Sequence, residues 1–229
     1  MNVLITGTAS GIGRQTALLF LERGHNVFGL DKKESSILES DFLQNKNCGI
    51  YKHFVCDISQ KESLPPLSGV EILVNNAGIQ SASEKDIFVN LIGTMNVTEK
   101  YAFQEKIKSV LFNASASALN GNEFPEYAAS KAGVVGYMKN CAIRLANEFK
   151  ATSNALCFGG VATELNVNVM QDKKLWQKIM DVTPLKRWAT VQEAAEWIYF
   201  MTVTNKFCTG QAIDISGGER NCADLFGWS

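Results

Sequence analysis

The sequence predicts an α/β fold of three layers (α/β/α), in which a doubly wound parallel sheet is flanked by helices. Short apolar runs rich in β-branched residues alternate with longer amphipathic segments along the whole chain. The apolar runs show no polar alternation, which is typical of parallel strands buried on both faces. A chain of 229 residues can bury one large core, so we expect a single domain over residues 1–229.

Seven apolar runs are predicted strands, at residues 3–6, 26–30, 50–56, 70–74, 109–112, 152–157 and 211–215. Predicted helices occupy residues 14–23, 84–102, 127–149 and 190–202. Apolar side chains cover more than one face of the helix over 84–102, which predicts burial on two sides. The segment over 164–181 is too apolar for an exposed loop, and it either forms part of a substrate lid (residues 164–189) or packs on the sheet.

The composition argues against nucleic-acid and membrane partners. Lys and Arg number 22 against 23 Asp and Glu, without a block of like charge. No apolar run approaches the ~20 residues that span a bilayer, and the N-terminus lacks the features of a signal peptide. Six scattered cysteines and two histidines fit neither a metal site nor a disulfide framework, so we expect a cytoplasmic protein with reduced thiols and no metal.

A glycine-rich turn follows the first predicted strand, with the spacing Gly-x3-Gly-x-Gly over residues 7–13. A strand, a glycine turn and a helix N-terminus together form a cradle for a diphosphate, because the free N–H groups face the ligand. Asp31 ends the second strand, where a carboxylate binds the two ribose hydroxyls of a dinucleotide and repels a 2′-phosphate. Asp31 therefore favours NAD(H) over NADP(H), unless it is an ordinary solvated carboxylate, and Lys32 and Lys33 could soften the repulsion.

Two more strands end in residues suited to a cofactor. Asp57 and Ile58 follow the third strand, where the carboxylate either accepts a hydrogen bond from an adenine amino group or caps the next helical segment. The fourth strand runs into Asn75-Asn76-Ala77-Gly78, where small residues allow a ligand to approach the backbone.

Tyr127 and Lys131 lie four residues apart and share one face of a predicted helix. A lysine ammonium beside a tyrosine stabilises the phenolate and lowers the tyrosine pKa toward neutral pH. Alone, such a pair more often belongs to an ordinary amphipathic helix. A cofactor pocket elsewhere in the chain favours the catalytic interpretation.

Four motifs in order give the chain its resemblance to the short-chain dehydrogenase/reductase family: Thr6-Gly7-x3-Gly11-x-Gly13, Asn75-Asn76-Ala77-Gly78, Tyr127-x3-Lys131 and Thr209-Gly210-Gln211. The resemblance covers essentially the whole chain. It implies a Rossmann-type fold and an NAD(P)-dependent oxidoreductase that interconverts a small-molecule secondary alcohol and a ketone. It also implies a homo-oligomer, a tetramer or dimer built on the helices around 84–104 and 127–149.

The resemblance implies a role for each matching residue. Tyr127 would be the proton donor or acceptor, Lys131 would lower its pKa and hold the nicotinamide ribose, Ser115 would bind the reacting oxygen, and Asn90 would position a water in the proton relay. Ser117 is the alternative serine. The implied cofactor-binding residues are Gly7, Ser10, Gly11, Ile12, Gly13, Asp31, Asp57, Ile58, Asn76, Ala77, Gly78, Tyr127, Lys131, Val161 and Thr163.

Two other functions are weighed against this one. The first is an NADPH-dependent 3-oxoacyl thioester reductase, which Asp31 disfavours. The second is a non-catalytic dinucleotide sensor, which has no need of the set Asn90, Ser115, Tyr127 and Lys131. The chain also departs from the family where Phe158 replaces the usual proline of a Pro-Gly pair beside the nicotinamide.

Overall fold

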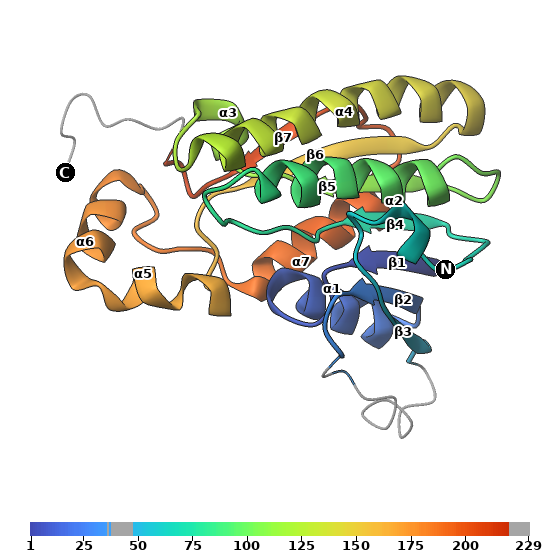
Figure 1. Cartoon of the computed structure of the whole chain (residues 1–229), viewed down its shortest axis with the longest axis horizontal. Helices are drawn as coiled ribbons and strands as arrows, with labels where there is room; N and C mark the ends of the chain where they lie inside the picture. The colour runs from blue at the N-terminus through green and yellow to red at the C-terminus, as the bar shows by residue number, and fades with distance from the viewer. Residues whose placement is uncertain (36, 38–47, 220–229) are drawn as a thin grey trace.

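Seven parallel strands form one sheet in the order β3-β2-β1-β4-β5-β6-β7 in the computed structural model, which describes residues 1–35, 37 and 48–219 (Figure 1). The predicted α/β fold is confirmed. The predicted strand positions hold to within two residues at each end. The strands are β1 Asn2–Thr6, β2 Asn26–Asp31, β3 Tyr51–Val55, β4 Ile72–Asn75, β5 Ser109–Asn113, β6 Thr152–Phe158 and β7 Ala212–Ile215.

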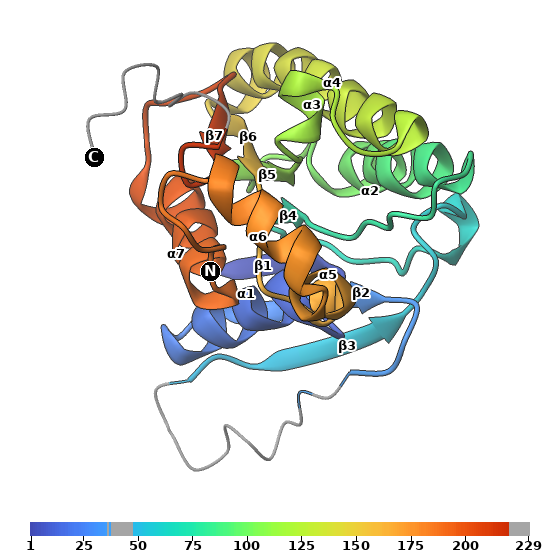
Figure 2. The ribbon, with the colours of Figure 1, turned by 90° about the vertical axis from the view of Figure 1, so that its left-hand side faces the viewer.

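Helices cover both faces of the sheet, as Figure 2 shows from the side. On one face α1 (Gly11–Glu22) and α7 (Val191–Tyr199) pack over a core that includes Phe20. On the other face lie the π-helical segment η3 (Ile87–Gly93), α2 (Thr94–Tyr101) and α4 (Pro125–Phe149), over a core that includes Phe112. The remaining short helices are η2 Lys61–Ser63, α3 Ser117–Asn120, η4 Glu164–Asn166, α5 Val167–Gln171, α6 Lys173–Val182 and η5 Phe200–Thr204.

The strand order reverses between β1 and β4, which are neighbours in the sheet although β2 and β3 separate them in sequence. In open parallel sheets, ligands bind at this switch point, outside the carboxyl ends of the strands. The glycine turn after β1 and the Asn75–Gly78 motif after β4 therefore lie together at this edge.

The helix predicted over 84–102 differs from the expectation in two ways. Its first part is π-helical, and within that part the side chain of Asn90 bonds to the backbone of Ile79 outside the helix. Burial on two sides is wrong for the single chain, since Phe88 and Ile92 have exposed fractions of 55% and 38%.

The segment after β6 extends from the body as η4, α5 and α6 (Figures 1 and 2). Asp172 begins α6 and accepts hydrogen bonds from the N–H groups of Lys174 and Leu175. Leu165 and Leu175 remain 69% and 41% exposed, so the apolar residues of this segment do not simply pack on the sheet. In the described residues no helix has the length and apolar character to cross a membrane.

Candidate active site

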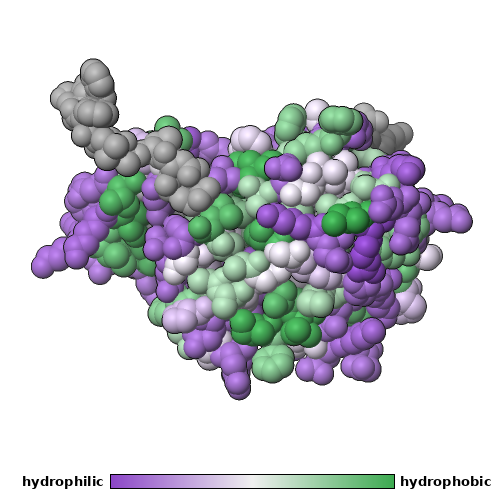
Figure 3. Space-filling view, turned by 90° about the horizontal axis from the view of Figure 1, so that it is seen from above, coloured by the Kyte–Doolittle hydropathy of each residue, from purple (hydrophilic) through white to green (hydrophobic). Residues whose placement is uncertain are grey.

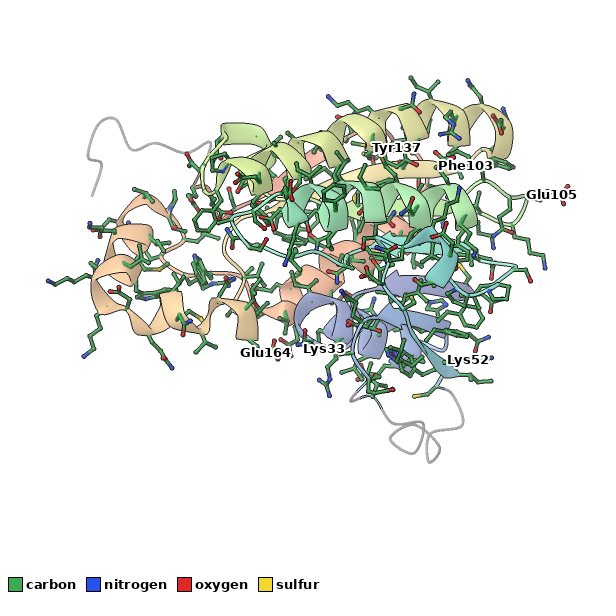
Figure 4. The ribbon with its side chains drawn as sticks, in the orientation of Figure 1. Lys33, Lys52, Phe103, Glu105, Tyr137 and Glu164 are labelled. Carbon is green, nitrogen blue, oxygen red and sulfur yellow. The ribbon has the colours of Figure 1, made fainter. Side chains whose placement is uncertain are left out.

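A cavity of about 840 Å³ opens at the carboxyl ends of the strands. Every residue predicted for the site lines it except Gly13 and Asn90, which lie behind its wall. Figure 4 labels two further lining residues, Lys33 from the loop after β2 and Glu164 from η4. The sequence-based site is therefore one continuous cavity, with the lid segment (residues 164–189) contributing one wall.

The glycine turn between β1 and α1 suits a diphosphate. Gly7 has a φ of +76°, and any Cβ on Gly13 would collide with the carbonyl oxygen of Gly7. The side chain of Ser10, the N-cap of α1, makes no capping hydrogen bond, so it leaves the first N–H groups of the helix to a ligand. The turn thus presents backbone donors and the positive end of the helix dipole to the cavity.

Asp31 lies beside this turn, at the end of β2. Its Oδ2 accepts a hydrogen bond from the N–H of Ala9 at 2.9 Å, and its Oδ1 accepts one from the N–H of Lys33 at 3.0 Å. A carboxylate oxygen accepts more than one hydrogen bond, so both oxygens can also accept from ribose hydroxyls. The residues of the cavity therefore fit a dinucleotide.

Asp57 forms an ion pair with Lys32, whose Nζ lies 2.8 Å from Oδ2, and accepts hydrogen bonds from Ser59. Burial opposes ionisation, but the bonds from Lys32 and Ser59 hold the pKa of Asp57 below its ordinary value. The ammonium of Lys32 is thus paired with Asp57. Lys33 donates a hydrogen bond to Asp31 from its backbone N–H.

A hydrogen-bonded chain joins the glycine turn to Lys131. Asn76 donates from Nδ2 to the carbonyl oxygen of Thr6 at 3.0 Å, and its Oδ1 accepts from Asn113 Nδ2 at 2.7 Å. The Nζ of Lys131 in turn donates to the carbonyl oxygen of Asn113 at 3.0 Å. The glycine turn and Lys131 are consequently positioned by the same strand ends.

Tyr127 and Lys131 share one face of α4, as predicted, with Lys131 Nζ 5.7 Å from the centre of the tyrosine ring. The expected lowering of the tyrosine pKa is wrong for the chain alone. Burial, with the negative charge of Glu123, raises the pKa of Tyr127 to about 12, and burial lowers the pKa of Lys131 to about 8. The hydroxyl of Tyr127 is therefore protonated and neutral at pH 7.

The two candidate serines interact with different groups. The Ser115 side chain opposes the rise in the pKa of Tyr127 by hydrogen bonding, and that of Ser117 opposes the rise in the pKa of Glu123. The two serine hydroxyls lie 3.0 Å apart, and both are buried.

Asn90 is held between two elements. Its Oδ1 accepts from the N–H of Ile79 at 2.7 Å, and its Nδ2 donates to the carbonyl oxygen of Ile79 and to Ser130 Oγ, at 2.9 Å and 3.0 Å. The buried asparagine therefore fixes the loop after Gly78 against α4, which gives the polar residue its partner.

Sequence reasoning missed Gln80, Glu123 and Trp188, all of which line the cavity. Glu123 is two residues before the proline that begins α4 and four before Tyr127, and this proximity was the available signal. Gln80 and Trp188 carry no comparable signal, since they reach the cavity only through the fold.

Comparison with known proteins gives a consistent result. Residues 7–219 match the family model adh_short_C2, described as enoyl-(acyl carrier protein) reductase. The chain is 31% identical to the 3-oxoacyl-(acyl-carrier-protein) reductase FabG of Thermotoga maritima, over 94% of this chain and 96% of that protein.

Solved structures resemble the fold over nearly its full length. A 4-hydroxyisoleucine dehydrogenase complexed with NADH superposes with a TM-score of 0.85 at 25% identity, covering 97% of this chain and 99% of that one. A gluconate 5-dehydrogenase of Burkholderia cenocepacia in complex with NADP and tartrate gives a TM-score of 0.86 at 24% identity, covering 97% and 96%. The latter likeness shows the fold alone.

Proposed function

The chain belongs to the short-chain dehydrogenase/reductase family and is an NAD(P)-dependent oxidoreductase, and from that premise we propose an NAD(H)-preferring enzyme that interconverts a secondary alcohol and a ketone. One observation carries the proposal: Ser115, Tyr127 and Lys131 line the same cavity as the glycine turn and Asp31. A non-catalytic sensor would have no need of a serine, a tyrosine and a lysine gathered beside the cofactor turn.

The residues of this site transfer the proton, whereas the hydride belongs to the cofactor chemistry. When bound, the nicotinamide supplies the hydride in reduction, accepts it in oxidation, and is positively charged in its oxidised form. In reduction the neutral Tyr127 hydroxyl donates its proton to the carbonyl oxygen, and Ser115 donates a hydrogen bond to the same oxygen. Lys131 orients the nicotinamide ribose, and Asn90 keeps the loop after Gly78 in place.

The preference for NAD(H) rests on Asp31. Its carboxylate is fixed beside the glycine turn by Ala9, where it would bind ribose hydroxyls and repel a 2′-phosphate. Lys32 pairs with Asp57, which leaves less of its positive charge to offset that repulsion. The proposed cofactor contacts otherwise follow the residues of the cavity, including Val161 and Thr163 near the nicotinamide and Asp57 and Ile58 near the adenine.

A homo-oligomer is supported by apolar residues on the helices that the family resemblance implicates. Phe88 and Ile92 on η3 and Ile143 on α4 are 55%, 38% and 65% exposed. The face seen from above, in Figure 3, shows apolar patches between hydrophilic ones. None of the cysteines in the described part of the chain forms a disulfide, which suits the proposed cytoplasmic location.

The test is a fluorescence titration of the protein with NADH and with NADPH, followed by rate measurements on Tyr127→Phe. We expect tighter binding of NADH, and a loss of turnover in Tyr127→Phe of at least ~100-fold with cofactor affinity retained. Turnover that survives in Tyr127→Phe would contradict the assigned chemistry, and tighter binding of NADPH would contradict the role of Asp31.

A second candidate is an NADPH-dependent 3-oxoacyl thioester reductase, favoured by the 31% identity to the FabG protein of Thermotoga maritima. Asp31 argues against it. Reduction of acetoacetyl-coenzyme A with NADPH that is faster than reduction of simple ketones with NADH would establish this candidate in place of the first.

A further inference from the structure

The hydroxyl of Ser117 connects the carboxylate of Glu123 to Ser115, the proposed catalytic serine. Its carboxylate accepts a hydrogen bond from Gln80 Nε2 at 2.9 Å and another from Ser117, whose Oγ is 3.0 Å from Ser115 Oγ. Two O–H···O bonds in series, each about 3 Å long, place the carboxylate at most about 6 Å from the Ser115 oxygen. A substrate held by Ser115 and Tyr127 would thus extend past this carboxylate.

The backbone at Glu123 is costly for a residue with a side chain. Its φ is +74°, close to that of Gly121 in the same loop, and glycine adopts such values without strain. Glutamate at this position therefore strains the backbone, and it places a carboxylate at the cavity wall. The residue as a whole is exposed, but its carboxylate is partly shielded from water, and that burial raises its pKa.

The wall that the lid segment contributes is mostly apolar. Its apolar lining residues are Leu165, Val169, Leu175, Ile179 and Trp188, and its polar ones are Glu164 and Asn166. The cavity therefore presents apolar side chains from the lid segment and, next to Ser117, the carboxylate of Glu123, with Glu219 as a further acidic lining residue. A ligand complementary to both has an apolar body and a hydrogen-bond donor near its reacting carbon.

We propose that Glu123 is a specificity-determining residue, which accepts a hydrogen bond from a hydroxyl or ammonium group one or two carbons from the reacting carbon of the substrate. This inference rests on the proposed alcohol/ketone chemistry and names its substrate class. The apolar body of the substrate packs against the lid segment. A carboxylate or phosphate at the same position is repelled by Glu123.

The test compares four alcohols that share one apolar ring. Oxidation with NAD at pH 7.5 is measured for cyclohexanol, trans-cyclohexane-1,2-diol, trans-2-aminocyclohexanol and trans-2-hydroxycyclohexanecarboxylate. In the wild type, kcat/KM for the better of the two donor-bearing alcohols is expected to exceed that for cyclohexanol at least ~10-fold, with the carboxylate the poorest. Preference for the amino alcohol identifies an ammonium, and preference for the diol a hydroxyl.

In Glu123→Gln the ratio of kcat/KM for the better donor-bearing alcohol to kcat/KM for cyclohexanol is expected to fall about 10-fold. The fall should come chiefly from a higher KM for the donor-bearing alcohol. Glu148→Gln, which removes an equal charge near the far end of α4, should keep the wild-type ratio. Glu123→Gly relaxes the backbone at φ +74° and provides a second variant with the same expected loss, should Glu123→Gln fold poorly.

An unchanged ratio in both Glu123 variants overturns the inference, while turnover that still depends on Tyr127 leaves the proposed function standing. Should the wild type oxidise none of the four, their binding to the enzyme–NADH complex is measured by the change in NADH fluorescence. Binding of the donor-bearing alcohols that Glu123→Gln does not weaken overturns the inference. Failure of NADH and NADPH to bind at all contradicts the proposed function itself.

Discussion

Lys131 donates a hydrogen bond from Nζ to the carbonyl oxygen of Asn113, 3.0 Å away, from a side chain that is only 6% exposed. The same Asn113 donates from its own side chain to Asn76, whose Nδ2 donates to the carbonyl oxygens of Thr6 and of Gly7 in the glycine turn. The buried ammonium therefore depends on the strand ends for a partner, and its position is fixed before any ligand binds.

This burial predicts a pH dependence of stability. Burial lowers the pKa of Lys131 to about 8 from the ordinary 10.5. Between these values the unfolded chain binds a proton that the folded chain has lost, so the free energy of unfolding rises with pH across this window, by about 3 kcal/mol in total. Below pH 8 both states are protonated, and the full cost of burying the charge is present.

Lys131→Met should remove this rise. Urea unfolding of the cofactor-free protein at pH 7.5 and at pH 10 gives the unfolding free energy at each pH. The increase between the two pH values is then compared between the wild type and the variant. Lys139→Met, on the exposed side of the same helix, should show the wild-type dependence. Equal pH dependence in wild type and Lys131→Met would show that the lysine titrates normally.

The two active-site serines should differ in their effect on turnover. Ser115 bonds to Tyr127, whereas Ser117 bonds to Glu123. Ser115→Ala removes a donor to the reacting oxygen and is expected to lower kcat about 100-fold or more. Ser117→Ala should cost less than about 10-fold in kcat. Steady-state kinetics of the pair decide the assignment, and the reverse order would make Ser117 the catalytic residue.

Much of this arrangement was predictable because it is local. The strands follow from continuous runs of β-branched residues, and the placement of Tyr127 and Lys131 on one face follows from their spacing on α4. The glycine turn follows from positions where the backbone needs a positive φ or no side chain, as at Gly7 and Gly13. Such features depend on neighbours in sequence.

Other features depend on contacts between distant residues and were not predictable. The side chain of Asn90, in the π-helical segment, bonds to the backbone of Ile79, eleven residues away. The raised pKa of Tyr127 comes from burial and from Glu123, neither of which is visible in the Tyr-x3-Lys motif. The ion pair of Lys32 with Asp57 likewise joins two strand ends.

Asp31 should set the choice between cofactors. Asp31→Asn keeps the size of the side chain but removes the charge that repels a 2′-phosphate. We expect the Kd for NADH to rise about 10-fold and that for NADPH to fall, because a charge-assisted hydrogen bond to ribose is lost together with the repulsion. Fluorescence titration with both cofactors measures the ratio. Glu34→Gln, three residues on and exposed, should leave the ratio unchanged.

Gly160 should be essential for the position of the lid segment. A Cβ at Gly160 would collide with the indole of Trp188, whose ring centre lies 4.9 Å from that of Trp176 on α6. Gly160→Ala must therefore displace Trp188 and is expected to cost about 1–3 kcal/mol of stability. Because Trp188 lines the cavity, the KM for an apolar alcohol should also rise.

Gly136→Ala is the matched control, since a Cβ at Gly136 would meet no atom within 4 Å in the described structure. Alanine is the better helix former, so this variant should be more stable by about 0.5–1 kcal/mol, with KM unchanged. Thermal unfolding and tryptophan emission of both variants provide the measurement. If Gly160→Ala retains wild-type emission, stability and KM, the indole is free to move, and Trp188 does not hold the lid segment at the cavity.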